Sequence, residues 1–121
     1  MDTVGLRFAT ALAAKDVDAI RGLLADDIDF KALTPRKFWE AADPDAVIDV
    51  LLGNWFQPDD HIDALVDVTE DAVEDTGRVG YRLAITTPDG PHTLEQQAYY
   101  RTDGDRIGYV RLVCSGYRPV G

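Results

Sequence analysis

The chain has 121 residues, 45% of them hydrophobic, which is enough for one packed core and too few for two ordinary domains. Its 22 acidic side chains against 12 basic ones give a formal charge of -10, so the protein should repel nucleic acid and anionic membrane surfaces. The N-terminus has no basic segment followed by an apolar run, and the single cysteine, Cys114, has no partner for an internal disulfide. We therefore expect one cytoplasmic domain over residues 1–121, with neither nucleic acid nor membrane as a partner.

The first predicted elements are two short amphipathic helices and a strand. Val4, Phe8 and Leu12 recur at helical spacing. A second helix is predicted to begin after Asp16, because aspartate is a common residue at helix N-termini. Apolar and charged residues then alternate over residues 28–32, which is typical of a half-buried strand.

The middle of the chain predicts one further helix. Residues 36–42 are expected to form a short helical or irregular segment that covers apolar side chains. A helix should begin after Asp43, with Pro44 in its first turn, and present a wide apolar face as far as Phe56. Pro58 ends this helix, since proline cannot continue it.

The second half of the chain predicts a sheet. Strands are expected at about residues 62–74, 78–87, 92–102 and 106–115, with a turn at Gly77 and glycine-containing turns between the later strands. Helices first and hairpin-linked strands afterwards predict an α+β fold, with helices on one face of a curved antiparallel sheet.

The run FATALAAKDVDAIRGLLADDIDF, from Phe8 to Phe30, resembles the opening of the nuclear transport factor 2-like superfamily. This superfamily includes ketosteroid isomerases, SnoaL-like polyketide cyclases and limonene epoxide hydrolases. The resemblance extends over residues 4–115, and the ending at residues 114–119 is similar to that of uncharacterised bacterial members. It implies a cone-shaped, cystatin-like sheet with the N-terminal helices packed on its concave face, a cavity for a small ligand, and a homodimer formed through the sheet.

The residues that ketosteroid isomerases use for catalysis are missing at the matching positions. Counted from the second helix, the family's tyrosine falls on Phe8 and its base on Ala32, while its acid falls on Gln97 or Ala98. The chain is therefore not expected to isomerise steroids by the family mechanism. The Asp-Arg-Asp arrangement of limonene epoxide hydrolases has only a poor local match at residues 95–97, which leaves the arginines of other strands to meet a carboxylate in the folded chain.

Two histidines and a glutamine–tyrosine pair are the candidate catalytic residues. SnoaL-like cyclases use an Asp or His as general acid or base, which directs attention to His61 and His92, although both positions are also typical of solvated strand ends. Alternation over residues 96–100 places one glutamine and one tyrosine on each face of the strand. If Gln97 and Tyr99 face the cavity, they would orient a carbonyl or hydroxyl of the ligand; otherwise the glutamine is exposed and the tyrosine packs on a neighbouring strand.

Several large or soft side chains are candidates for ligand contact. They are Phe8, Trp39, Trp55, Phe56, Leu112 and Cys114. Trp39 lies on the expected irregular segment and has the strongest case, whereas Trp55 and Phe56 at helical spacing are also typical of ordinary core. Cys114 is more typical of a buried thiol than of a nucleophile. The acidic residues around His61 match no closed zinc or calcium motif, so neither a metal nor a cofactor is expected.

These observations favour a protein that binds a small apolar, oxygen-bearing metabolite inside the cone. If it is an enzyme, we expect a cofactor-independent cyclase, isomerase or dehydratase. The alternatives are a non-catalytic small-molecule-binding module and a dimerisation module of the same fold. The sequence leaves open whether there is turnover.

Overall fold

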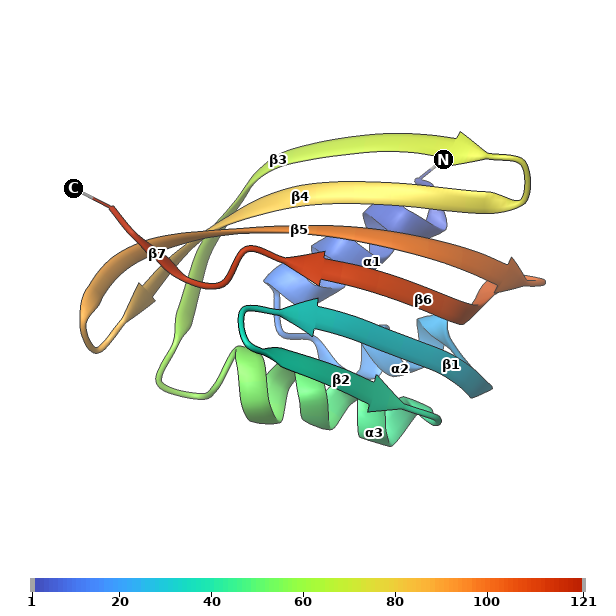
Figure 1. Cartoon of the computed structure of the whole chain (residues 1–121), viewed down its shortest axis with the longest axis horizontal. Coiled ribbons are helices and arrows are strands. Elements are labelled where there is room, and N and C mark those ends of the chain that lie inside the picture. The colour runs from blue at the N-terminus through green and yellow to red at the C-terminus, as the bar shows by residue number, and fades with distance from the viewer. Residues whose placement is uncertain (1, 121) are drawn as a thin grey trace.

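The computed structural model describes residues 2–120 as a strongly curved sheet with helices on one side (Figure 1). The helices are α1 (Val4–Ala13), α2 (Val17–Leu23), α3 (Pro44–Ile48) and the π-helix η1 (Asp49–Trp55). The strands are β1 (Leu24–Thr34), β2 (Lys37–Ala41), β3 (His61–Val73), β4 (Thr76–Thr87), β5 (Gly90–Asp103), β6 (Arg106–Cys114) and β7 (Arg118–Pro119). Within residues 2–120, none of the helices has the length and apolar character needed to cross a membrane.

The three α-helices begin at side-chain caps. The Thr3 hydroxyl accepts a hydrogen bond from the Leu6 N–H, and the carboxylates of Asp16 and Asp43 accept from N–H groups in the first turns of α2 and α3. Each cap satisfies a backbone donor that has no partner within the helix. The predicted helix starts after Asp16 and Asp43 are confirmed.

The strand order is β2-β1-β6-β5-β4-β3, and β7 pairs with β5. Every neighbouring pair is antiparallel except β1 and β6, which are parallel. The expected α+β fold with a curved sheet is confirmed, but the sheet is mixed and not wholly antiparallel. The reason is that β1 and β6 are far apart in the chain, so no tight turn imposes an antiparallel direction on them.

Residues 36–42, expected to be helical or irregular, instead contain strand β2. Phe38 and Glu40 are exposed while Trp39 and Ala41 are half-buried, which is the alternation of a strand on the rim of a sheet. The turn from β1 is made by Pro35 and Arg36, and Arg36 adopts the left-handed conformation with φ of 68°. The short hairpin turn therefore decides the structure of this segment.

The predicted helix after Asp43 is present, but its second half is a π-helix. The N–H of Phe56 donates to the carbonyl of Leu51, five residues earlier, at 2.8 Å. The Asn54 side chain donates to the Asp49 carbonyl at 2.9 Å, so part of the hydrogen bonding in this wide turn comes from a side chain. Further along, the turn expected at Gly77 lies at residues 74–75, and Gly77 itself is part of β4.

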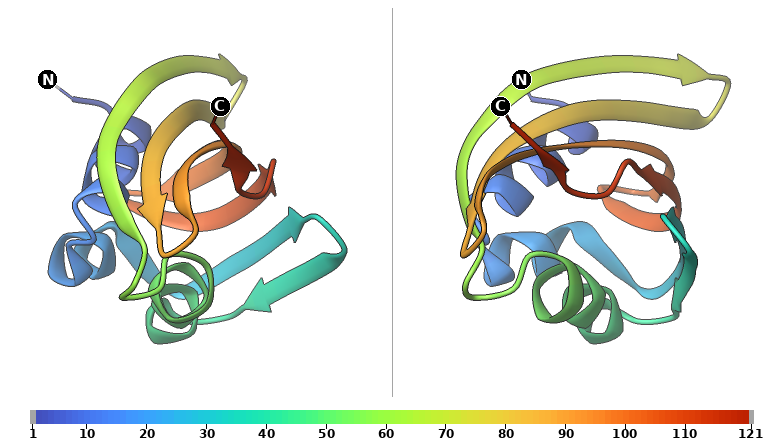
Figure 2. Two further views of the ribbon diagram at one scale, coloured as in Figure 1. Left: turned by 90° about the vertical axis from the view of Figure 1, so that its left-hand side faces the viewer. Right: turned by 60° about the vertical axis from the view of Figure 1, so that its left-hand side comes forward.

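The core fills the concave side of the sheet, which curves over the helices (Figure 2). Its largest fully buried side chains include Leu12, Ile20, Phe30, Phe56 and Leu112. The apolar stripes of α1 and α2 supply the opposing surface. The helices therefore seal the concave side, and the outer side of the sheet remains open.

Tyr100 joins α1 to the sheet through two glycines. A Cβ atom on Gly5 would lie 2.7 Å from the Tyr100 Oη, and one on Gly77 would lie 2.7 Å from its Cζ. Burial raises the pKa of Tyr100, and a hydrogen bond to the backbone of Gly5 opposes this effect. The aromatic ring fits between helix and strand because neither glycine has a side chain.

Candidate functional site

The concave face has one polar centre, at Gln96 on β5. Among residues 2–120, Gln96 is the one fully buried side chain outside the apolar and aromatic types. Tyr81 of β4 lies opposite it, and the Tyr81 hydroxyl donates a hydrogen bond of 2.6 Å to the Gln96 Oε1. Cys114 of β6 is the neighbour on the other side. Three adjacent strands thus bring a phenol, a carboxamide and a thiol together in an apolar interior.

Two buried N–H donors on this side have no hydrogen-bond partner among the described residues. They are the Nε2 of Gln96 and the Nε1 of Trp55. Leaving a buried donor unpaired costs about 1–3 kcal/mol, so native structures keep such groups rare. Both unpaired groups are donors, and no charged side chain is fully buried in the described part of the chain.

Trp55 is positioned by the π-helix at whose end it lies. Its ring packs 6.3 Å from that of Phe30 and 6.0 Å from that of Trp39, measured between centroids. The indole N–H of Trp39 donates to the Thr34 hydroxyl at 2.8 Å, whereas the N–H of Trp55 has no such partner. A π-helix widens a turn and occurs frequently at functional sites, and Trp55 is the last residue of this one.

The segment after β6 packs on the end of η1 and on β5 through Tyr117. The Tyr117 ring stacks on Phe56 with centroids 6.2 Å apart and lies 6.0 Å from the ring of His92. Its hydroxyl lies 2.8 Å from the carbonyl of Trp55 and 3.0 Å from the Oδ2 of Asp60. Burial, reinforced by the Asp60 carboxylate, raises the pKa of Tyr117, so its hydroxyl is protonated at neutral pH.

Cys114 is a protected thiol. Its side chain is 8% exposed, and its Sγ accepts a hydrogen bond of 3.4 Å from the N–H of Gly116. Burial raises the pKa of this thiol, although the nearby Gln96 amide and the Gly116 N–H partly oppose the shift. A protonated, covered thiol is a poor nucleophile and packs here as a small apolar group.

The structure places Gln96 and Tyr100 toward the core, and Gln97 and Tyr99 on the outer face. Gln97 is half-buried and its Oε1 lies 3.4 Å from the Arg78 Nη1, while Tyr99 is 43% exposed. The pair suggested for the cavity, Gln97 with Tyr99, is therefore on the opposite side of the sheet from the polar centre. A sequence signal for this orientation exists: Glu95 and the other charged residue of this parity, at position 101, belong on the solvated face.

The two histidines lie apart from Gln96 in different surroundings. His61 is 78% exposed at its side chain and lies 3.4 Å from the Asp63 carboxylate. His92 is half-buried, its Nδ1 is 2.9 Å from the carbonyl of Gly90, and its ring touches Tyr117. Of the two, His92 is the one that lies beside the segment after β6.

The candidate ligand contacts all belong to the core or its border. Phe8, Phe56 and Leu112 are almost fully buried, and Trp39 and Trp55 are half-buried. Phe8 and Ala32, which stand where an isomerase has its tyrosine and base, are both packed in the core. The arrangement provides apolar walls around Gln96 but no carboxylate at those two positions.

The arginines left open as epoxide hydrolase residues do meet carboxylates, but on the outer face. Arg111 contacts Asp29 at 2.9 Å and Arg82 contacts Glu95 at 3.2 Å, both on exposed strand positions. Arg101 lies 3.9 Å from the Asp75 carboxylate in the same way. No Asp-Arg-Asp cluster is formed by these arginines on the concave side of residues 2–120.

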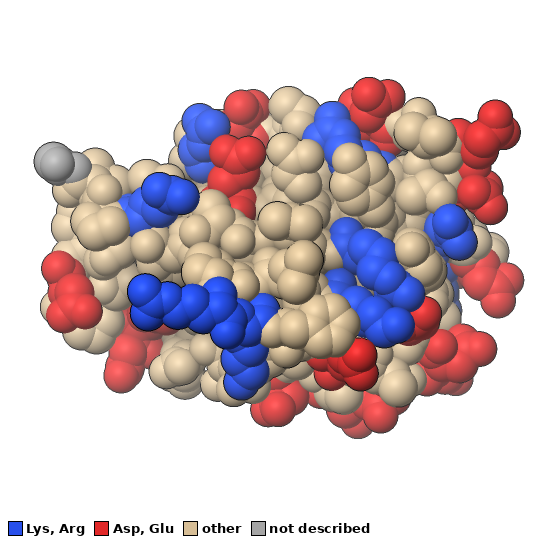
Figure 3. Space-filling model, in the orientation of Figure 1, with Lys and Arg blue, Asp and Glu red and all other residues tan. Residues whose placement is uncertain are grey.

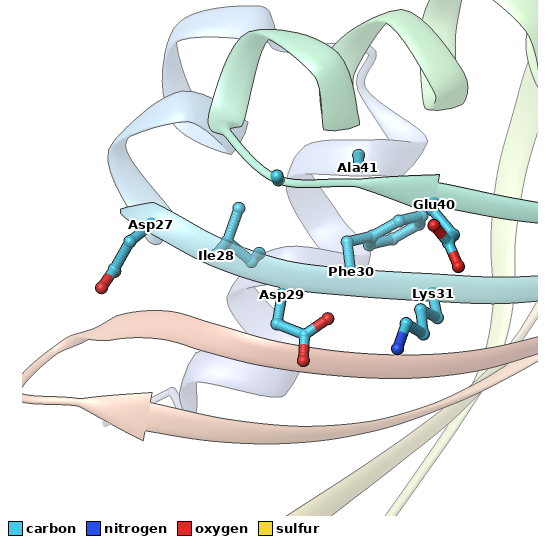
Figure 4. Close-up of a pocket in the computed structure, with 8 residues that line it drawn as sticks. Asp27, Ile28, Asp29, Phe30, Lys31, Glu40 and Ala41 are labelled. Carbon is cyan, nitrogen blue, oxygen red and sulfur yellow. The ribbon is translucent and has the colours of Figure 1, made fainter.

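A surface hollow of about 450 Å³ lies beside β1, where β2 ends. Its charged lining residues are Asp27, Asp29, Lys31 and Glu40. Figure 4 shows the alternation along β1, with Phe30 directed toward the helices and Asp29 and Lys31 directed away from them. The hydrogen bond from Arg111 holds the pKa of Asp29 below its usual value, so this carboxylate is already engaged. Among the described residues, no cluster of His, Cys, Asp and Glu is arranged to hold a metal ion.

Comparisons with known proteins identify relatives by structure but not by sequence. No protein-family model matches the chain, and no curated protein is similar to it in sequence. An LEH-like epoxide hydrolase of M. tuberculosis is similar in structure, with a TM-score of 0.70 at 16% identity over 93% of this chain and 80% of the other. A presumed isomerase of Rhodopseudomonas palustris gives 0.78 at 16% identity over 96% and 92% of the two chains.

A presumed polyketide cyclase of Xanthomonas campestris is similar too, with a TM-score of 0.70 at 16% identity over 91% of this chain and 86% of the other. The chain has the nuclear transport factor 2-like fold, and that prediction is confirmed. At this level of identity the likeness shows the fold alone, and the three proteins carry names from three different reaction classes.

Proposed function

We propose that the chain binds a small, mainly apolar molecule through an acceptor oxygen on the concave side of the sheet, beside Gln96 and Trp55. The observation that supports this proposal is the pair of buried N–H groups without a partner. A carbonyl oxygen has two lone pairs, so a ligand carbonyl would be able to accept from two such donors. The surrounding Phe30 and Leu112 would bury the rest of the ligand.

The ligand class follows from the charges that the site lacks. An anion would lose its hydration without meeting a buried cation, and an ammonium group would meet two N–H donors and no buried carboxylate among residues 2–120. An uncharged ketone, lactone or ester meets neither penalty. The three structural relatives, named for an epoxide hydrolase, an isomerase and a polyketide cyclase, support an oxygen-bearing small molecule in this fold.

A solvatochromic ketone, 2-acetyl-6-(dimethylamino)naphthalene, tests the binding. Its fluorescence should rise and its emission should shift when the wild-type protein binds it. Gln96→Leu and Trp55→Phe should each weaken binding about tenfold, because each removes one hydrogen bond of about 1.4 kcal/mol. Gln97→Leu is the matched control and should bind as the wild type does. Equal affinity of the wild type and Gln96→Leu, or no binding by the wild type, would refute the proposal.

As an enzyme the chain would be a cofactor-independent cyclase, isomerase or dehydratase. Of the residues predicted to be catalytic, we retain His92 as the proton carrier, because it is half-buried and lies beside Tyr117, whose hydroxyl donates to the Trp55 carbonyl. His61 is exposed, and Gln97 and Tyr99 lie on the outer face, so we assign them no role at the concave site. Imidazole exchanges protons readily near neutral pH.

The same ketone separates catalysis from binding. Its acetyl protons are acidified by the carbonyl, so an enzyme that forms an enolate would exchange them for deuterium in D₂O, as proton NMR would show. Loss of exchange in His92→Ala, with binding retained, would support catalysis. Binding without exchange would select the non-catalytic module, which is favoured by the core residues Phe8 and Ala32 at the isomerase positions.

We also propose a homodimer formed through the outer face of the sheet. Phe38, Leu33 and Val113 lie side by side in register on three strands, and each is about half exposed. Basic residues of β1, β4, β5 and β6 gather over this face, which Figure 3 shows among acidic residues, although the chain carries a charge of -10. The outer face is thus the place where two acidic copies would repel each other least.

Sedimentation velocity over a concentration series tests the dimer. The wild type should sediment as a dimer and Val113→Asp as a monomer, while Val66→Asp on the edge strand β3 should leave the dimer intact. A monomeric wild type at every concentration would refute this proposal. We place the protein in the cytoplasm, because its single cysteine stays a free thiol.

A further inference from the structure

We infer that residues 116–120, here called the C-terminal strap, form a gate that opens to admit ligand to the site beside Gln96 and Trp55. This inference rests on the proposed function for its purpose. The strap follows Ser115, whose N–H donates to the Glu95 carbonyl and whose hydroxyl accepts from the Glu95 N–H, both at 2.9 Å. Beyond this fixed residue the strap has a sharp turn, a two-residue strand and Tyr117 as its anchoring side chain.

The strap begins with a sharp turn. Gly116 has a φ of +75°, in the left-handed region that favours glycine. A Cβ atom at this position would lie 2.8 Å from the Cγ of Pro35, in the turn between β1 and β2. The strap therefore turns sharply away from β6 against the rigid ring of Pro35.

The end of the strap is held by few backbone contacts. Strand β7 contains two residues, and they pair with His92 and Thr93 of β5. The N–H of Val120 donates to the Pro91 carbonyl at 3.1 Å. Arg118, Pro119 and Val120 are exposed, so these three residues bury no side chain that would hold the strap in place. So short a strand opens at low cost compared with the long central strands.

Tyr117 is the anchor of the strap. Its hydroxyl faces two acceptors, the carbonyl of Trp55 and the carboxylate of Asp60, but a phenol has only one proton to donate. The anchor is therefore weaker than its two contacts imply. The loop between η1 and β3, which carries Asp60, is held in place. Lys15 donates to the backbone carbonyls of Gln57 and Asp60 and so fixes this loop to the turn between α1 and α2.

The strap contacts the neighbours of the two groups that the proposed site uses. Tyr117 stacks on Phe56 and holds the backbone of Trp55, whose side chain carries one of the unpaired donors. The Gly116 N–H binds the sulfur of Cys114, which lies beside Gln96. When Tyr117 leaves, the Trp55 carbonyl loses its hydrogen bond, and Gly116 can move away from the Cys114 sulfur. The loop that Lys15 holds and the strap that Tyr117 anchors to it thus form the two halves of the gate.

Cys114 is the only cysteine in the chain, so its accessibility reports the opening directly. The rate at which folded protein reacts with 5,5′-dithiobis(2-nitrobenzoate) should rise roughly fivefold in Tyr117→Phe, which keeps the ring but loses a hydrogen bond of about 1 kcal/mol. Tyr117→Ala should react faster still, because the stacking on Phe56 is lost as well. Tyr109→Phe, on the outer face between Arg101 and Arg111, should react at the wild-type rate.

A second variant separates opening of the strap from unfolding of the whole chain. Gly77→Ala disturbs the packing of Tyr100 far from the strap, so it should lower global stability without faster thiol labelling. Wild-type labelling rates in Tyr117→Phe, or equal acceleration by Gly77→Ala, would overturn the inference. Labelling needs no ligand, so its failure is distinguishable from failure of ketone binding. Where the ketone binds, its association rate should increase in Tyr117→Phe by the same factor as labelling does.

Discussion

The concave and outer faces of the sheet are made from alternating residues of the same strands, yet they differ completely in chemistry. On β5, Gln96 is fully buried and bonded to Tyr81, whereas its neighbour Gln97 is half-buried beside the guanidinium of Arg78. The concave face holds one polar centre in an apolar layer. The outer face holds ion pairs and exposed apolar side chains such as Val113.

This difference shows that the register of β5 decides which of the two glutamines is buried and which lies on the outer face. A shift by one position exchanges every side chain between the faces, and it would bury Glu95 and expose Leu94. The cost of burying the charge fixes the register. Gln96 is then carried to the interior because it has the same parity as Leu94 and Ala98, and it becomes the group that a ligand oxygen would meet.

The largest effect that tests the comparison comes from removing matched phenylalanines. Phe30→Ala on the concave face should lower the free energy of unfolding by about 3–5 kcal/mol, because it leaves a cavity beside Trp55. Phe38→Ala, with 51% of the residue exposed on the outer face, should cost far less. Urea denaturation of both variants measures the difference, and equal losses would contradict the assignment of the two faces.

The second effect concerns the ring held between two glycines. Gly77→Ala should destabilise the chain by about 1–3 kcal/mol, because the new methyl group would lie 2.7 Å from the Tyr100 Cζ and Gly5 blocks retreat on the other side. Gly22→Ala in α2 is the control, since nothing lies within 4 Å of its new Cβ. At Gly22 alanine should stabilise the helix by up to about 1 kcal/mol. Thermal unfolding should therefore show a lower Tm for Gly77→Ala and a higher Tm for Gly22→Ala than for the wild type.

The third effect isolates the polar centre. Tyr81→Phe should cost about 1 kcal/mol or more, because it leaves the Gln96 oxygen without its donor. The double variant Tyr81→Phe/Gln96→Leu should regain wild-type stability or exceed it, because it also removes the unpaired amide N–H. A double-mutant cycle in urea measures the coupling. A double variant that is less stable than either single one would show that the centre serves stability and not a ligand.

The smallest effect lies on the outer face. The hydrogen bond from Arg111 lowers the pKa of Asp29, so this pair stabilises the fold above the unfolded carboxyl's pKa. The contribution is lost as the pH falls through the folded pKa. Arg111→Met should raise the Asp29 pKa toward its usual value, as carboxyl carbon shifts in an NMR titration would show. Arg82→Met, paired with Glu95, should leave the Asp29 titration unchanged.

The sequence by itself determined the local elements and their order. Asp16 and Asp43 predicted the starts of two helices, alternation predicted the strands, and the order of helices and strands predicted the α+β class. These signals are local, since a cap or an apolar period is read within a few residues. The nuclear transport factor 2-like fold followed from their combination.

Only the tertiary structure decided the features that depend on distant residues. The parallel pairing of β1 with β6 and the contact of Tyr117 with Asp60 join segments far apart in the chain. The charges on β5 were enough to predict that Gln96 and not Gln97 is buried. They did not predict the hydrogen bond that Gln96 makes, because its partner Tyr81 comes from another strand. Local patterns place side chains on a face, whereas packing between strands decides which of them meet.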